Sequence, residues 1–256
     1  MVTLDHVRFY SQFNAEGKRS IAHVVERLST FPAEKDIVTK QAAARISEDD
    51  VYTVVRLVDQ NTFLTQQKGM EEDSLGNASI KIFRGVIKEN LSTFSAFCLS
   101  REGNTLFAGA EDGYLMGWDL SNLGSHRSID KIKAFSENTL ITALSFVYGD
   151  ESVVVGNQKG AITTWSLTPT EWSGNKKRMR QLHAFSSHSA PIIALRPTSR
   201  DKSVLSWTNE GSVHLDHMTS EQRLITIEND DLWQKVSLSE RGNGLAALDT
   251  TGKLMI

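Results

Sequence analysis

The stretch FSAFCLSREGNTLFAGAEDG, residues 94–113, is the first of four twenty-residue segments that align with one another without gaps. The other three are ITALSFVYGDESVVVGNQKG (141–160), IIALRPTSRDKSVLSWTNEG (192–211) and WQKVSLSERGNGLAALDTTG (233–252). Their last residues are Gly113, Gly160, Gly211 and Gly252, which are separated by 47, 51 and 41 residues. A period of about 40 to 50 residues is typical of the blades of a β-propeller. Insertions between blades account for the drift in spacing.

Each segment has the pattern of a strand, a polar turn and a second strand. Two positions are apolar in all four segments and are expected to be buried: the fourth (Phe97, Leu144, Leu195 and Val236) and the thirteenth (Leu106, Val153, Val204 and Leu245). Small and polar residues between them suit a tight hairpin turn. The final glycine closes a second turn, because glycine takes a positive φ without steric cost. A third strand is then expected to begin.

Tryptophan occupies the same place in two of these third strands. Trp118 and Trp165 each lie five residues after their glycine, and we expect both to pack between blades. Trp118-Asp119 is the dipeptide after which WD repeats are named, whereas the next two repeats have Trp165-Ser166 and Asp216-His217 at this place. The Gly-His pair that opens many WD repeats is absent, so the sequence gives no ground to assume the hydrogen-bonded tetrad of well-formed WD repeats.

A weaker copy of the repeat precedes the four clear ones. In residues 51–67, Val54 and Phe63 occupy the apolar positions, with a turn at 59–61; residues 69–76 are expected to be an enlarged loop and 79–83 a returning strand. Residues 7–25 have the pattern of part of one more blade. We therefore predict an all-β, WD40-like β-propeller of six or seven four-stranded blades. It is expected to be a single domain over residues 1–256, with clear blades at 94–256 and weaker ones at 1–93.

Composition and motifs argue against several functions. The net charge of −3 does not suit nucleic-acid binding, which needs a basic surface. The lone Cys98 offers no disulfide or thiolate metal site. No phosphate-binding loop, nucleophile elbow or His-Glu-x-x-His motif occurs. We predict no catalytic, cofactor-binding or metal-binding residues, and no enzymatic activity.

The histidines and the one basic cluster favour structural or solvated roles over binding sites. His214 and His217 flank Asp216, but three-residue spacing on a strand puts the two imidazoles on opposite faces, so a metal site is not expected. His183 and His188 are expected to be surface or turn residues. The basic cluster at residues 176–180 is expected to lie in a solvated loop between blades.

Parts of the repeats resemble one bacterial family. Residues 141–146, 155–160 and 219–224, with 244–249 and 252–254, are similar to the propeller insert of phosphate transporter permeases. These are the PstC-type permeases of the phosphate-specific ABC importer, in a long form found in gammaproteobacteria. In that family a WD40-like domain lies between the first transmembrane helix and the permease core. Both ends of the present sequence have the appearance of cuts from a longer membrane protein of this kind.

The resemblance implies a place on the periplasmic side of the bacterial inner membrane. The implied partners are the membrane core of the same permease, the partner permease subunit, the ATPase subunit and the periplasmic phosphate-binding protein. The domain would then contribute docking, gating or sensing to phosphate uptake, and no transport residue can be assigned to it. The alternative hypothesis is an intracellular WD40 scaffold that mediates protein–protein interactions.

Overall fold

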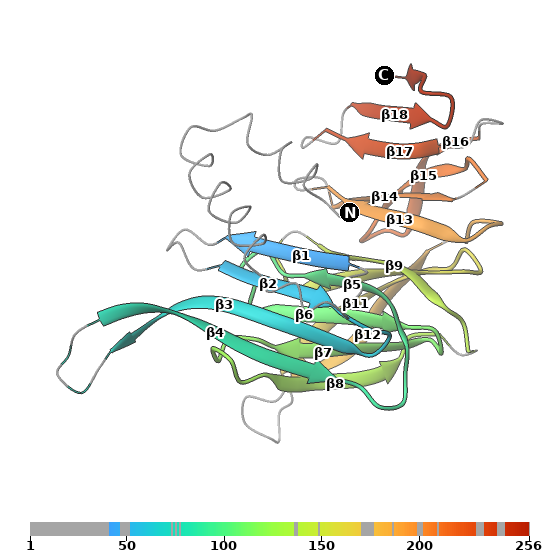
Figure 1. Ribbon diagram of the computed structural model, residues 1–256. Helices are drawn as coiled ribbons and strands as arrows, with labels where there is room; N and C mark the ends of the chain where they lie inside the picture. Colours follow the sequence, from blue (N-terminus) through green and yellow to red (C-terminus); the bar gives the residue numbers. More distant parts are fainter. Residues whose placement is uncertain are drawn as a thin grey trace. The chain divides into compact units, whose positions relative to one another are not determined.

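The protein is all-β throughout the part that can be described. The computed structural model describes residues 41–46, 52–72, 74, 76, 78–135, 138–147, 149–169, 177–185, 187–198, 202–208, 210–228, 233–239 and 244–255. These residues form five antiparallel sheets and no helix (Figure 1). They accordingly contain no helix of the length and apolar character needed to cross a membrane. The all-β prediction is confirmed.

Each sheet is a simple meander in which sequence neighbours pair. The first contains β1 (Gln41–Ile46), β2 (Tyr52–Leu57), β3 (Thr62–Glu72) and β4 (Ala78–Lys88). The second contains β5 (Phe94–Leu99), β6 (Thr105–Ala110), β7 (Tyr114–Asp119) and β8 (Arg127–Lys133). The third contains β9 (Ile141–Phe146), β10 (Ser152–Asn157), β11 (Ile162–Pro169) and β12 (Lys177–Phe185). The fourth contains β13 (Ile192–Pro197), β14 (Ser203–Thr208), β15 (Val213–His217) and β16 (Gln222–Ile227), and the fifth contains β17 (Trp233–Leu238), β18 (Leu245–Asp249) and β19 (Leu254–Met255).

The chain divides into two compact units. The first takes in the described residues up to Leu91, with Leu99–Leu106 and Trp118–Arg127. The second takes in Ser92–Cys98, Phe107–Gly117 and the described residues from Ser128 onward. The single domain expected from the repeats stays a prediction.

The four repeat segments begin where strands begin. β5, β9, β13 and β17 start at Phe94, Ile141, Ile192 and Trp233, the first residues of the segments. The terminal glycines Gly113, Gly160, Gly211 and Gly252 have φ of +85°, +82°, +90° and +88°. The carbonyl oxygens of the first three also accept hydrogen bonds from the chain leading into the next sheet, from Ala134 N, His188 N and Trp233 Nε1. The glycine therefore links its turn to the start of the following repeat.

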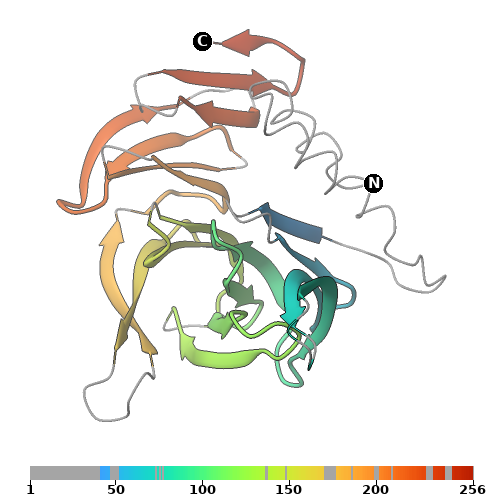
Figure 2. The same cartoon turned by 90° about the vertical axis from the view of Figure 1, so that its left-hand side faces the viewer.

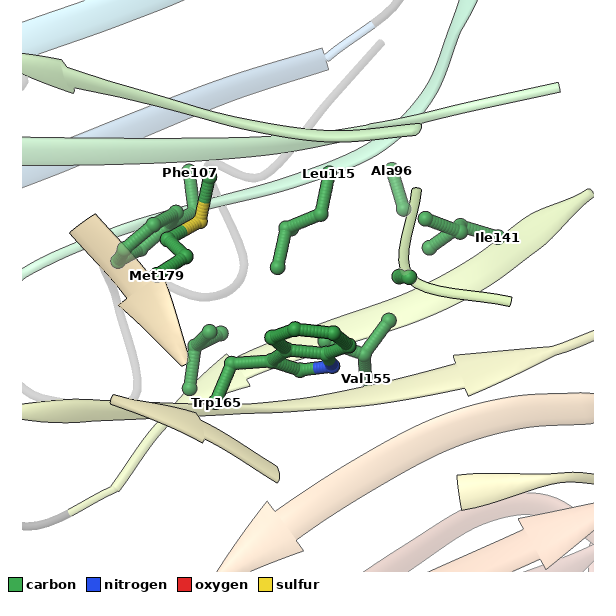
Figure 3. Packing of buried hydrophobic residues seen from close by; sticks show 9 residues of the cluster. Ala96, Phe107, Leu115, Ile141, Val155, Trp165 and Met179 are labelled. Carbon is green, nitrogen blue, oxygen red and sulfur yellow. The ribbon is translucent and has the colours of Figure 1, made fainter. Parts of the chain in front are cut away.

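In the second unit, consecutive sheets bury their faces against each other. Between β5–β8 and β9–β12 lies a cluster that includes Phe107, Leu115, Trp165 and Met179 (Figure 3). Two further clusters lie between β9–β12 and β13–β16, and between β13–β16 and β17–β19. Figure 2 shows the backbone of these sheets, coloured from yellow to red along the chain. Adjacent residues of one strand supply opposite faces: Val204 belongs to one of these clusters and Leu205 to the other. This stacking is the packing expected of propeller blades.

The first residue of a segment makes inter-sheet contacts in three of the repeats, a role that the repeat alignment does not single out. Phe94, Ile141, Ile192 and Trp233 are all buried. A Cβ on Gly156 would lie 2.7 Å from Cγ2 of Ile192, and one on Gly109 would overlap Ile141 in the same way. Glycine on β6 and β10 therefore makes room for the isoleucine of the next sheet. Of the predicted fourth-position core residues, Leu195 and Val236 are buried, whereas Phe97 and Leu144 are only half-buried.

The first sheet differs from the sequence prediction. Val54 and Phe63 are buried and the turn at 59–61 is present, where Asp59 Oδ1 accepts a hydrogen bond from Asn61 N. However, this hairpin joins the second and third strands of the sheet, because β1 precedes it. Residues 69–72, predicted to be loop, continue β3. They remain extended because they pair with β4 as far as Glu72 and Ala78.

Two other expectations concern loops and the N-terminal segment. Of the basic cluster at 176–180, residues Lys177–Arg180 belong to the outer strand β12 and not to a loop. They pair with residues Ser166–Pro169 of β11. The partial blade predicted at residues 7–25 lies outside the described residues.

Candidate functional site

A group of buried polar side chains lies on one face of the sheet β13–β16. Val204 on β14 faces the sheet β9–β12, so Ser206, two residues further on, faces the same way. The register pairs Val204 with Asp216 and Ser206 with His214, which places these two β15 residues on that face as well. His188, from the connection before β13, completes the group.

Two histidines form the centre of this group. The rings of His188 and His214 are stacked, with centroids 3.6 Å apart and planes 15° from parallel. His188 Nε2 lies 2.8 Å from Ser206 Oγ, and its Nδ1 lies 3.3 Å from Ser212 Oγ. Both histidine residues are almost fully buried, with 4% and 5% of their surface exposed. Through these contacts His188 holds the connection that precedes β13 against the sheet β13–β16.

A buried ion pair adjoins the two rings. Arg223 on β16 donates from Nε to Asp216 Oδ1 over 2.7 Å, and its Nη1 lies 3.1 Å from His214 Nε2. Asp216 has no exposed surface, and its Oδ2 has no hydrogen-bond partner among the described residues. An arginine can only donate, so His214 Nε2 is the acceptor in this contact, and His214 Nδ1 has no hydrogen-bond partner among the described residues. Asp216 occupies the repeat position that holds Trp118 and Trp165 in the two preceding repeats.

The surroundings keep both imidazoles uncharged at neutral pH. Burial, with added repulsion from His214 and Arg223, lowers the pKa of His188 from 6.5 to about 3. The pKa of His214 is also lowered, mainly by burial and then by Arg223, although Asp216 and Glu228 act in the opposite direction. Because charging His188 would place a cation between two serines and close to Arg223, the folded state excludes a proton there.

The free energy of unfolding should therefore fall as the pH is lowered from about 6.5 towards 3. In this range the unfolded chain binds a proton at His188 and the folded chain does not, so acid favours unfolding. One such histidine gives a slope of about 1.4 kcal/mol per pH unit. Urea denaturation at a series of pH values measures the slope, which His188→Asn should reduce. His217→Asn, on the half-buried end of β15, is the control, and an equal reduction in both variants would contradict the assignment to His188.

This arrangement has the chemistry of a structural network and not of a reaction centre. A serine beside a histidine resembles a nucleophile and its base, but Ser206 is fully buried, so no substrate reaches its hydroxyl. No carboxylate bonds to His188 to orient it, since its two ring nitrogens contact serines. Among the described residues, no group of three or more His, Cys, Asp and Glu side chains is placed to hold a metal ion.

The residues singled out in the sequence have diverse surroundings. Trp118 and Trp165 are buried; the Trp118 ring meets Phe63 edge-on at 6.3 Å, and Trp165 Nε1 donates to Thr163 Oγ1 over 2.9 Å. His183 lies on the outer strand β12 and bonds to Glu221. His214 is buried while His217 is half-buried and contacts Ser220, as expected for opposite faces.

The prediction that His188 is a surface or turn residue is wrong with respect to exposure. Its backbone lies in the connection between two sheets, but its ring inserts between Ser206 and Ser212. In this repeat a histidine network nevertheless forms around His188. Ser187-His188 provides the histidine without the usual glycine before it, and this dipeptide is the one sequence signal that could identify the network.

Comparison with known proteins identifies the fold. No protein-family model and no curated protein sequence matches the chain. Among solved structures it is similar to the β-propeller domain of Cps50 (Swd1) from Myceliophteria thermophila, with a TM-score of 0.58 and 14% sequence identity. The match covers 82% of this chain and 67% of that one. Together with the successive four-stranded sheets, this establishes an all-β, WD40-like β-propeller.

Proposed function

We propose that this chain is a non-catalytic, protein-binding propeller domain. The observation that carries the proposal is the fold, because propellers present outer strands and loops on a rigid framework and commonly serve as interaction modules. The buried polar groups support it, since His188, His214, Asp216 and Arg223 bond to one another or to neighbouring serines instead of opening to a substrate. Several large apolar side chains remain exposed on outer strands, including Val86, Leu224 and Ile225.

The more specific proposal concerns the parent protein. We infer from the resemblance of residues 141–160 and 219–224 that the domain belongs to a PstC-type permease of a phosphate importer. It would then lie on the periplasmic side of the inner membrane, joined to the membrane core and near the second permease and ATPase subunits. Its role would be to dock the phosphate-binding protein and so bring phosphate to the membrane. The sequence resemblance alone supports this step.

Docking can be tested with two purified proteins. We expect isothermal titration calorimetry to detect binding of the domain to the periplasmic phosphate-binding protein with Kd of about 1 to 100 μM, the range of a transient encounter. Lysozyme is the unrelated control. If no heat of binding is detected with the proteins at several hundred micromolar, any Kd is weaker than roughly that concentration, and the docking proposal is contradicted.

A second test separates the two cellular settings. The gene that encodes this chain should also encode transmembrane helices on both sides of it if the permease proposal holds. If it does not, the protein-binding function stands and the intracellular scaffold becomes the better proposal.

A further inference from the structure

The hairpin of β3 and β4 extends beyond the sheet to which it belongs. Each strand has 11 residues, but β2 pairs with β3 only from Phe63 to Gln67. Lys68–Glu72 consequently pair with β4 alone and form a two-stranded ribbon, which projects past β1 and β2 in Figure 1. A two-stranded ribbon is only marginally stable in water without further packing.

One face of this ribbon is held by the connection between β7 and β8. Gln67 Nε2 donates to Leu120 O over 2.7 Å, and Gln67 Oε1 accepts from Gly124 N over 3.3 Å. Gly69 leaves the space that Leu123 fills, since a Cβ there would overlap the leucine side chain. The ribbon is therefore fixed in its orientation, with its other face turned away from this connection.

The other face of the β3–β4 hairpin, from the ribbon into the sheet, carries apolar side chains at strand spacing. Ile80, Ile82 and Val86 of β4 are 62%, 40% and 63% exposed, and Arg84 between them is exposed too. We call these four residues the strip. A solvated strand face is normally polar, so three exposed β-branched side chains in register favour a binding surface.

The strip is also positively charged. Arg84 has no ion-pair partner among the described residues, whereas Lys81 on the opposite face is paired with Glu71. Arg84 is thus a charged residue in the middle of an otherwise apolar strip. A ligand that covers the strip is best matched if it brings both apolar surface and negative charge.

We propose that the strip binds an acidic amphipathic segment of a partner protein, in which apolar side chains alternate with carboxylates. The apolar side chains cover Ile80, Ile82 and Val86, and a carboxylate pairs with Arg84. The strip is about 20 Å long, which matches some six extended residues. This inference rests on the protein-binding function proposed above and assigns it to one surface.

The probe is a fluorescein-labelled peptide of about eight residues in which leucine and glutamate alternate, a length that covers the strip. Fluorescence anisotropy measures its binding to the full chain at low and high salt. Arg84→Glu and Val86→Ser should each weaken binding about tenfold, and salt should weaken the wild type but not Arg84→Glu. Leu224→Ser, at a similarly exposed apolar site on the outer strand β16, should bind like the wild type.

Several outcomes would overturn the assignment. Equal binding by the wild type and both strip variants would place the peptide elsewhere, and equal affinity for a leucine–lysine peptide would remove the role of charge. Strip-dependent binding to phosphatidylglycerol vesicles without peptide binding would make the surface a membrane contact. Dimerisation in sedimentation experiments that Arg84→Glu abolishes would make a second copy the occupant. If the phosphate-binding protein binds wild type and strip variants alike, the proposed function stands and only the strip assignment fails.

Discussion

Replacing Gly160 by alanine is expected to lower the free energy of unfolding by about 3 kcal/mol or more. Gly160 has φ of +82°, a region that side chains with a Cβ adopt at a cost. The new Cβ would overlap the carbonyl oxygen of His188 and lie 2.8 Å from that of Ala190. Both are main-chain atoms, and the His188 amide donates to Gly160 O over 2.9 Å, so the connection cannot retreat without losing this bond.

Gly252 is a matched control for the Gly160 substitution. It ends the last repeat segment with φ of +88°, but a Cβ there would meet nothing within 4 Å. Gly252→Ala should therefore cost only the backbone strain, about 1 kcal/mol. Urea denaturation followed by tryptophan fluorescence compares the two. Equal losses would show that φ alone sets the cost, and that the contact with residues 188–190 is unimportant.

The sequence predicts the β-hairpins well wherever their signals are local. From Phe94 onward, the first strand of each sheet follows from apolar alternation and each second turn from a glycine, both within twenty residues. The same signals do not predict the fourth strands, such as β12. The residues that join one sheet to the next are harder to recognise. Gly109 and Ile141 belong to different segments, and their contact depends on how two sheets stack. No pattern within either segment contains that information.

The first sheet shows where local signals mislead. β1 has the sequence QAAARI, and alanine favours helices, so nothing in it suggests a strand. Its extended conformation comes from pairing with β2 over all six residues. Because β1 is not recognisable in the sequence, residues 51–67 are predicted to form the first two strands of the sheet. The end of β3, up to Glu72, is for the same reason predicted to be a loop.

The candidate site is the least predictable part of the protein. A lone histidine in a turn is normally solvated, and the burial of His188 depends on Ser206 and Ser212, which are 18 and 24 residues away. In the sequence, Asp216 is only a departure from the tryptophan of other repeats. A carboxylate is tolerated at this position because Arg223, from the neighbouring strand, pairs with it.

Arg223→Met should lower the free energy of unfolding by about 3 to 5 kcal/mol, the loss typical of leaving one member of a buried ion pair alone. Asp216 would be left with no exposed surface and without the 2.7 Å bond from Arg223 Nε. Methionine retains much of the arginine side chain's aliphatic volume, so lost packing contributes little. Urea denaturation at pH 7 measures the effect. Arg180→Met, an exposed arginine on the outer strand β12, is the control and should change stability by less than about 0.5 kcal/mol.

The double variant Asp216→Leu/Arg223→Met tests whether Arg223→Met lowers the free energy of unfolding because the Asp216 carboxylate has lost its partner. Taking two charges out of water costs free energy that their attraction only partly offsets, so an apolar pair of similar volume can replace a buried ion pair at little cost. The double variant should therefore recover most of the stability that Arg223→Met loses, giving a large coupling between the two sites. The tryptophans at the equivalent position of two other repeats support this, because they show that the repeat accepts an apolar side chain there. If the double variant were as unstable as Arg223→Met, the arginine would stabilise the sheet through His214, whose Nε2 lies 3.1 Å from its Nη1, and not through Asp216.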